Sequence, residues 1–397
     1  MKHLFTLLLS IAVLSFAGVS PAADSPAASL SPEQLAEFQR LLPGVELTPE
    51  LVRMMTDISL NTNMSVHERL KAIAKLSGID KLPEGQRVKQ VICIWDIVGR
   101  AGPIYGAAME ARAQALEFGV ELDMVPYTNE TIMIEEFKSG RCDAALMTGM
   151  RARQFNKYTG SIDAIGALPT QEHVQTLFQV VTNPRTAGKM VQGEYVILGV
   201  FSGGAAYVFV NDREINTLAK AAGKKVAVLE YDPMQAKMIA GVGATPVSTD
   251  ITRAPGMFNN GVVDILAAPL LAYEVLELYK GMTPNGGIIN YPLAQITMQL
   301  VGRLDKFPNE VAQLIREASF EQYPRILEMV SREEEKVPQK WWIQIPQDDM
   351  REYENMMQQS RITLRDMDYY DADMLTLQRK IRCKYGPDRS ECVNPVE

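Results

Sequence analysis

The chain has 397 residues, of which 47% are hydrophobic and 22% charged, and its formal net charge at pH 7 is -8. This composition indicates a globular protein long enough for two domains or two lobes, and it excludes a disordered chain. The excess of acidic residues argues against a nucleic-acid binder, which needs a basic stripe.

The N-terminus has the pattern of a secretory signal peptide. A short polar start precedes an apolar run from Leu4 to Phe16, and small residues follow as far as Ala23. The apolar run is shorter than the roughly 20 residues that a membrane-spanning helix needs. We therefore expect a signal peptide over residues 1–23, cleaved after Ala22 or Ala23, and a soluble mature protein in the periplasm.

Residues 24–85 are predicted to form a helical extension ahead of the main body. The strings Ser31-Pro32-Glu33 and Thr48-Pro49-Glu50 each place a capping residue before a proline at the first helical position. A third helical pattern covers Val66 to Leu76. No motif stands out here, so we expect an added layer or a brace.

An alternation of strands and helices predicts a first α/β lobe over residues 86–206. Strand–helix–strand order implies parallel pairing with right-handed crossovers. Ligands of such sheets lie beyond the carboxyl ends of the strands. The expected strands begin at Val88, Val120 and Cys142, and the expected helices are Pro103–Phe118 and Thr131–Lys138.

A second alternation predicts another α/β lobe over residues 207–290. Residues 291–337 are expected to hold a crossover strand and a hinge helix, and residues 338–397 a C-terminal helical extension. The expected strands begin at Val196, Ala206, Lys224, Ala244 and Val263, and the expected helices are Ile215–Ala222, Pro233–Gly241, Arg253–Asn260 and Tyr273–Tyr279. One long strand is expected from Ile288, and one long helix from Pro308 to Lys336 with a kink at Pro324.

Four cysteines in an oxidising compartment permit disulfides. Cys383 and Cys392 enclose a short loop with the Gly and Pro of a turn, so we predict a bond between them. Cys93 and Cys142 lie in apolar runs that should be neighbouring strands. Two buried thiols are slightly favoured there over a second disulfide, and both alternatives stay open.

No catalytic constellation is present in the sequence. It has no GxSxG elbow, no P-loop and no GxGxxG after the first strand. Three histidines in the chain offer little for a zinc site. We therefore expect no enzyme activity, no metal and no cofactor, and a small-molecule solute as the partner in place of nucleic acid.

Four stretches resemble the solute-binding subunits of tripartite ATP-independent periplasmic (TRAP) transporters. Together they cover roughly two-thirds of the chain. The third is the most specific, because spacing and residue types hold over a long run. The stretches are FKSGRCDAALMTGMRARQF from Phe137, GGAAYVFVNDREINTLAKAAGKKVAV from Gly203, GATPVSTDITRAPGMFNNGVVDILAAP from Gly243, and the strand and long helix from Ile288.

The resemblance implies a two-lobed fold like that of periplasmic binding proteins, with crossover strands, a long hinge helix and helical extensions. It also implies that a small polar or anionic solute is captured in an interlobe cleft, for TRAP-type membrane subunits. This sequence departs from the family at two arginines that would bind a substrate carboxylate. Ala227 replaces one, and the other falls near Ala205.

An alternative function is a periplasmic accessory or sensor protein of the same fold, for example one associated with efflux, that feeds no transporter. Such a chain could not itself be a proton-driven pump of the inner membrane, because it has no spanning helices.

Ligand contacts are expected at the strand ends of both lobes. Arg153, with Arg151 as its alternative, would take the anion-binding role left empty at Ala227, because a guanidinium fork grips a carboxylate with two parallel bonds. Asp96 and Glu230 would instead favour an amine or a cation. The expected residues are Trp95, Asp96, Tyr127, Arg151 and Arg153 in the first lobe and Tyr207, Glu230, Tyr231, Asn259 and Pro269 in the second.

Overall fold

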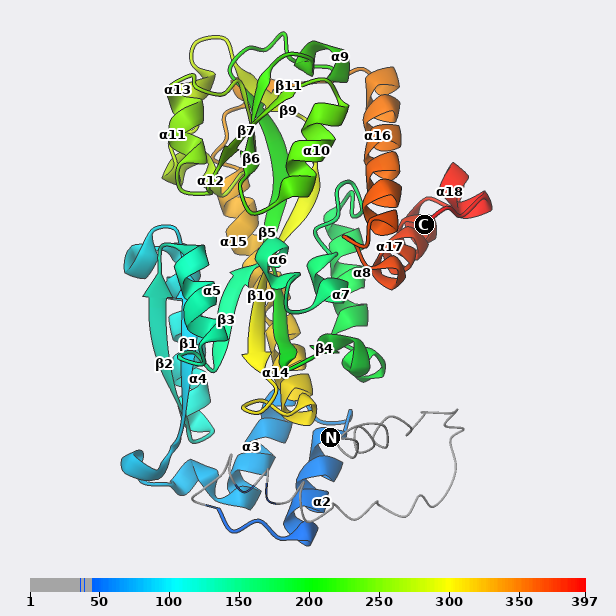
Figure 1. Cartoon of the computed structure of the whole chain (residues 1–397). Helices are drawn as coiled ribbons and strands as arrows, with labels where there is room; N and C mark the ends of the chain where they lie inside the picture. Colours follow the sequence, from blue (N-terminus) through cyan, green and yellow to red (C-terminus); the bar gives the residue numbers. More distant parts are fainter. Residues whose placement is uncertain (1–35, 37–38, 40–44) are drawn as a thin grey trace, which may run out of the picture.

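The computed structural model describes residue 36, residue 39 and residues 45–397. The expected signal peptide, its cleavage site and the start of the helix expected at Ser31 lie outside these residues. The described chain forms two lobes, one above the other in Figure 1, with helical extensions below and to one side.

One mixed sheet runs through both lobes in the order β2-β1-β3-β10-β5-β8-β6-β7. Strand β1 pairs in parallel with β2 and β3, and β6 pairs in parallel with β7 and β8, as the two alternations predict. The first lobe holds β1 (Val88–Trp95), β2 (Val120–Tyr127) and β3 (Ala144–Thr148), and the second holds β6 (Lys225–Leu229), β7 (Thr245–Thr249) and β8 (Ile265–Pro269).

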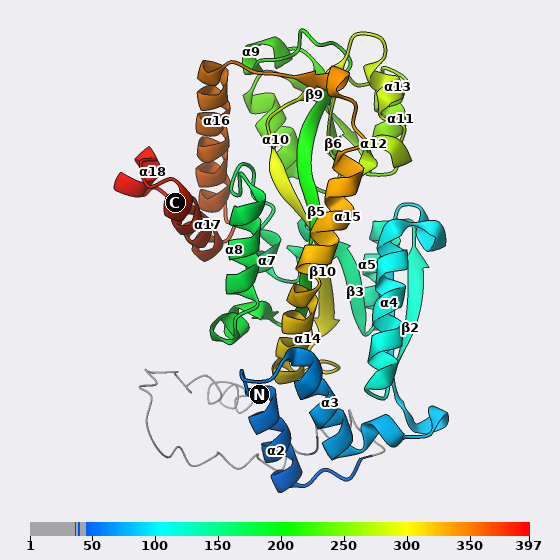
Figure 2. The same cartoon turned by 180° about the vertical axis from the view of Figure 1, so that it is seen from behind.

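Helices cover the sheet in both lobes. In the first lobe, α4 (Pro103–Glu117) and α5 (Glu130–Lys138) lie on opposite faces of the sheet, as the two views show (Figures 1 and 2). The second lobe carries α9 (Leu218–Ala221), α10 (Pro233–Gly241), α11 (Ala254–Asn259), α12 (Ala272–Val275) and α13 (Tyr279–Met282). Three helices that the sequence analysis did not anticipate follow β3: α6 (Gly149–Ala152), α7 (Lys157–Gly160) and α8 (Gln171–Val181).

Two antiparallel strands join the lobes. β5 (Tyr195–Val210) is one continuous strand where two were expected, so the expected lobe boundary at residues 206 and 207 falls inside it. Its first part pairs with β10 (Ala294–Arg303) and its last part with β8. The strand expected from Ile288 is divided into β9 (Gly287–Ile289) and β10. Pro292 lies in the gap, where a missing N–H interrupts a ladder.

The expected hinge helix is also divided, into α14 (Asn309–Glu321) and α15 (Tyr323–Glu334). The two run end to end behind both lobes (Figure 2). Pro324 occupies the first turn of α15, where its missing N–H costs no hydrogen bond. The expected kink is therefore a break at Gln322.

Two disulfides are present in the described chain. The predicted Cys383–Cys392 bond is confirmed. Cys93 is also bonded to Cys142, with a Cα–Cα distance of 5.8 Å, which settles the alternative left open by the sequence. This second bond ties β1 to the segment that enters β3.

Helical extensions flank the lobes. The N-terminal pair, α2 (Pro49–Ser59) and α3 (Val66–Ser77), lies at the foot of α14, where Arg69 pairs with Glu317. The C-terminal extension begins with β11 (Trp342–Ile343) and continues as α16 (Gln347–Asp366), α17 (Ala372–Tyr385) and α18 (Ser390–Val393). Within the described residues, no helix is both long enough and apolar enough to cross a membrane.

Candidate functional site

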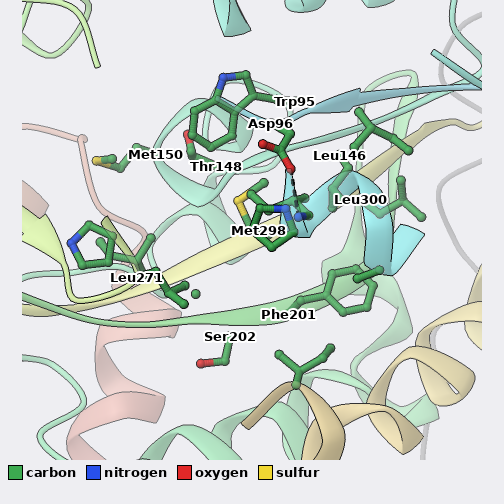
Figure 3. A pocket seen from close by; sticks show the side chains of 18 of the residues that line it. Trp95, Asp96, Leu146, Thr148, Met150, Phe201, Ser202, Leu271, Met298 and Leu300 are labelled. Atoms are coloured by element: carbon green, nitrogen blue, oxygen red, sulfur yellow. Dashed lines mark hydrogen bonds between the residues drawn. The ribbon is translucent and has the colours of Figure 1, made fainter. Parts of the chain in front are cut away.

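An elongated cavity of about 1650 Å³ opens between the two lobes and continues along α4, α14 and α15 to the N-terminal helices. We call it the interlobe cavity. Its wall includes the strand ends of the first lobe, the crossover strands and the second lobe (Figure 3). Its volume exceeds the roughly 300–1,000 Å³ of an ordinary ligand pocket. Most of the wall is apolar, as illustrated by Leu146, Phe201, Leu271, Met298 and Leu300.

Trp95 and Asp96, which were expected to contact a ligand, line the interlobe cavity at the end of β1. Asp96 is fully buried, and its carboxylate accepts hydrogen bonds from the backbone N–H groups of Val98, Ile104 and Tyr105 at 2.8–3.0 Å. The carboxylate thus holds the first turn of α4, where an anion is stabilised by the helix dipole. Its negative charge is already stabilised by these backbone N–H groups, so it is not available to a cationic solute.

Arg153 also lines the cavity, because β3 ends directly before α6 and Arg153 is the C-cap residue of that helix. Its Nε donates to the carbonyl of Gly160 at 3.1 Å, and its guanidinium lies over the ring of Tyr369 at 4.1 Å. A side chain at position 160 would collide with the Arg153 backbone, so this close approach requires glycine. The guanidinium of Arg153 is therefore held by a hydrogen bond at Nε and by the Tyr369 ring along one face.

Two acids act on Arg153 from longer range, Asp163 and Asp232. Asp163 accepts hydrogen bonds from the hydroxyl and the backbone N–H of Thr297, and burial raises its pKa to about 7. Asp232 accepts from the first backbone N–H groups of α10 and from the hydroxyl of Tyr369 at 2.6 Å. Neither lies within 4.0 Å of Arg153 as an ion pair.

Arg151 is not part of the cavity wall and forms a contact between the lobes. Its guanidinium lies 3.4 Å from the ring centre of Tyr231 in the second lobe. Its Nε lies 3.9 Å from the carboxylate of Glu130, whose pKa is raised by burial. Within the described residues, neither this nitrogen nor the facing oxygen of Glu130 has a hydrogen-bond partner. The aromatic face stabilises the cation, so Arg151 and Tyr231 form an interlobe contact.

Four other expected residues lie outside the interlobe cavity. The ring of Tyr207 packs against Trp342 on the other face of β5. Glu230 is exposed, with Arg253 at 3.4 Å. Asn259 bonds the backbone of Leu276 and Gly281. Tyr127 ends β2 at the edge of the sheet.

Pro269 does line the cavity, at the end of β8. So does Ala227, the position at which the resemblance would place a carboxylate-binding arginine, and it presents only a methyl group. At this position the second lobe therefore presents an apolar group where a cation was implied.

The C-terminal extension contributes residues to the cavity that were not predicted from the sequence. Tyr369 and Tyr370, from the turn between α16 and α17, line the cavity beside Arg153. The feature of the sequence that could have indicated this contribution is the pair of adjacent tyrosines in an otherwise acidic segment. Their contact with Arg153 spans more than 200 residues, so no local pattern could reveal it.

Comparison with known proteins agrees with this architecture. Residues 77–395 match the family described as "Solute-binding protein AdeT 1/2". The "Probable solute-binding protein AdeT1" of Acinetobacter baumannii is 40% identical over 299 residues, which cover 75% of this chain and 98% of that protein.

Solved structures share the fold at lower identity. A TRAP periplasmic solute-binding protein from Desulfovibrio salexigens, with bound orotic acid, aligns with a TM-score of 0.62 at 15% identity, over 75% of this chain and 99% of that one. Another, from Xanthobacter autotrophicus Py2 with bound β-D-galacturonate, aligns with a TM-score of 0.59 at 15% identity, over 74% and 99%. These likenesses confirm the two-lobed fold. On the extent of the family match and the identity to AdeT1, the chain belongs to the AdeT 1/2 family of solute-binding proteins.

Proposed function

We propose that this solute-binding protein captures an organic acid with a largely apolar body, and that Arg153 binds its carboxylate. A single observation carries the proposal. Five cations of the described chain line the interlobe cavity, and Arg153 alone has no carboxylate within 4.0 Å. The others are paired: Lys306 with Asp143, Arg325 with Glu110, Arg332 with Glu328, and Lys336 with Glu333 and Glu274.

The geometry of Arg153 suits a carboxylate. Its Nε is engaged by Gly160, while its two terminal nitrogens donate to no group in the described part of the chain. They are also not among its fully buried, unpartnered atoms. Two terminal N–H groups on a planar fork match the two oxygens of a carboxylate, which gives specificity as well as energy.

The apolar body of the solute follows from the rest of the wall. Val98 of the first lobe and Val275 of the second line the same cavity and are each more than 40% exposed. Closure of the lobes on a solute would bury such surface at about 25 cal/mol per Å². Because Ala227 offers no second cation, the cavity suits one carboxylate on an apolar frame better than a polyhydroxylated acid.

Support for an acidic ligand also comes from the fold. The two neighbours named above hold orotic acid and β-D-galacturonate, both organic acids. The alternative, a cationic or neutral solute held by Asp96 and Glu230, has less support, because the first carboxylate is engaged by backbone N–H groups and the second lies outside the cavity.

The cellular setting is part of the proposal. We infer an exported protein, cleaved after Ala22 or Ala23, that binds without catalysis and delivers its solute to a TRAP-type membrane pair. A neighbouring gene pair that encodes such subunits would favour delivery over an accessory or sensor role. An intact N-terminus in the membrane fraction would contradict cleavage.

A thermal-shift panel tests the binding function directly, because a ligand that binds only the native state raises the melting temperature. The panel contains benzoate, orotate, succinate, galacturonate and the amine benzylamine. We expect the carboxylates, and benzoate most, to raise the melting temperature, and benzylamine to leave it unchanged. A larger shift with benzylamine than with any acid would reverse the assignment.

Substitution of Arg153 tests its role. For an acid that shifts the melting temperature, Arg153→Ala should weaken binding by roughly 30-fold or more, since truncation of a buried charge contact costs about 2 kcal/mol or more. Arg325→Ala is the matched control, because Arg325 lines the same cavity but is paired with Glu110. Equal affinities for the two variants in calorimetry would exclude Arg153 as the carboxylate ligand.

A further inference from the structure

The C-terminal extension crosses from one lobe to the other. Strand β11 pairs with β9 of the second lobe, and Tyr353 in the first half of α16 packs on that lobe's core with Val226 and Ala244. The second half of α16 reaches the first lobe, where Arg361 donates to the carbonyl of Ile165 at 2.8 Å. With 20 residues, α16 is a rod about 30 Å long laid against both lobes (Figure 1).

Beyond α16 the extension is fixed to the first lobe alone. Gln378 is fully buried and donates to the carbonyls of Ser161 and Ile162, and Arg382 donates to the carbonyl of Ala167. The backbone N–H of Asp371 donates to the Ser161 hydroxyl. Backbone contacts of this kind are replaced only at the cost of unpaired buried groups, so the turn between α16 and α17 moves with the first lobe.

Tyr369, in that turn, connects the first lobe to the second. Its hydroxyl donates to the carboxylate of Asp232 at 2.6 Å, and Asp232 caps α10 of the second lobe. Tyr369 and two residues of the same helix, Met234 and Met238, pack against one buried cluster that includes Tyr370. The Tyr369 ring lies under Arg153 and lines the interlobe cavity. The Tyr369 side chain thus contacts Arg153, which we propose binds the carboxylate, and it also lines the cavity and contacts the opposite lobe.

We propose that the C-terminal extension is a third wall of the solute site, and that Tyr369 couples the position of Arg153 to the closure of the two lobes. The Tyr369–Asp232 hydrogen bond holds the lobes at the spacing of this structure before any solute is bound. The extension therefore restricts the opening of the lobes and presents Arg153 in a fixed orientation. Only the identity of the solute rests on the function proposed above.

The test compares Tyr369→Phe with Tyr385→Phe. The first removes the hydroxyl that reaches Asp232 and keeps the ring under Arg153. The second removes a hydroxyl of α17 that contacts Thr176 of the first lobe and does not line the cavity. Both are nearly isosteric, so both variants should fold with an intact extension.

The main readout needs no ligand. In solute-free protein, Tyr369→Phe should speed amide exchange in α10 and in the turn at 367–371 by about tenfold, the effect of losing one hydrogen bond to a charged group. Its radius of gyration in small-angle X-ray scattering should exceed that of the wild type. Tyr385→Phe should match the wild type in both regions and in size. Equal exchange and equal size for the two variants would overturn the proposal.

The solute-bound readout tests the wall itself, with benzoate as the probe. Tyr369→Ala should raise the dissociation constant at least about fivefold over Tyr369→Phe, because the ring that orients Arg153 is lost. Equal constants for these two variants would overturn the role of the ring. If the wild type binds no acid, the proposed function fails, while the solute-free comparison still decides whether Tyr369 couples the lobes.

Discussion

At the scale of single residues, Asp163 carries the clearest dependence on pH. It is buried, with Thr297 as its hydrogen-bond partner, and burial raises its pKa to about 7. The folded state therefore binds a proton more tightly than the unfolded chain, in which an aspartate titrates near 3.9. The contribution of Asp163 to stability falls as the pH rises from about 4 to about 7 and then levels off, because only the folded state loses a bound proton in that range.

The variant Asp163→Asn should lose this dependence. Relative to it, the wild type should lose up to about 1.4 kcal/mol of unfolding free energy for each pH unit inside the window. Urea denaturation between pH 4.5 and pH 8 measures the two slopes. Asp305→Asn, at an exposed acid, should follow the wild type. Parallel curves for Asp163→Asn and the wild type would show that Asp163 does not titrate in this range.

At the scale of elements, the two disulfides should differ in their contributions to stability. The Cys93–Cys142 bond spans a sequence separation of 49 and the Cys383–Cys392 bond one of 9. In the chain-entropy description, the larger loop constrains the unfolded state by about 4 kcal/mol and the smaller by about 2.6 kcal/mol. Loss of the first bond should also loosen β1 against β3, and with them the edge that carries Trp95.

Paired serine substitutions check this order. Replacing Cys93 and Cys142 together should lower the unfolding free energy by about 1.4 kcal/mol more than replacing Cys383 and Cys392 together. Chemical denaturation of the oxidised proteins gives both values. A larger loss from the second pair would indicate that the C-terminal extension, and not the first lobe, limits global stability.

The parallel strands of both lobes were predictable, because buried strands separated by helices leave a periodic pattern. The divisions at Pro292 and Gln322 were not, since a proline shows that a ladder or helix is disturbed and not how the chain resumes. At the site, the sequence placed Trp95, Asp96, Arg153 and Pro269 on the cavity wall. The sequence did not show that the Asp96 carboxylate accepts hydrogen bonds from the start of α4, because these backbone partners depend on how the chain turns between β1 and α4.

Residues far apart in sequence set the remainder of the site. Tyr207 and Glu230 were expected in the cleft from their places on strands, but a strand presents alternate residues to opposite faces. Tyr207 falls on the face toward Trp342, and Glu230 lies past the end of β6 in solvent. The Tyr369–Asp232 contact joins residues 137 positions apart. No periodicity encodes such a contact.

At the scale of the whole molecule, the interlobe cavity is larger and more apolar than one carboxylate requires. Arg153 lies on the wall beside the C-terminal extension, while Ile92, Ile94 and Leu122 extend the wall across the first lobe and Ile315 extends it to α14. A solute anchored by its carboxylate at Arg153 can therefore place a hydrocarbon body along this surface. Each methylene removed from water there contributes about 0.8 kcal/mol.

A homologous series of straight-chain carboxylates, from acetate to octanoate, tests this property of the cavity. The dissociation constant should fall about fourfold with each added methylene until the apolar surface is covered, because about 0.8 kcal/mol per methylene corresponds to that factor. Titration calorimetry at several temperatures should give a heat-capacity change of binding that becomes more negative along the series, as burial of apolar surface requires. Arg153→Ala should weaken every member by a similar factor, since it removes the shared carboxylate contact and leaves the apolar wall intact. If affinity is instead flat along the series, or greatest for succinate or galacturonate, the apolar wall does not contact the solute, and the cavity must close on a smaller and more polar acid.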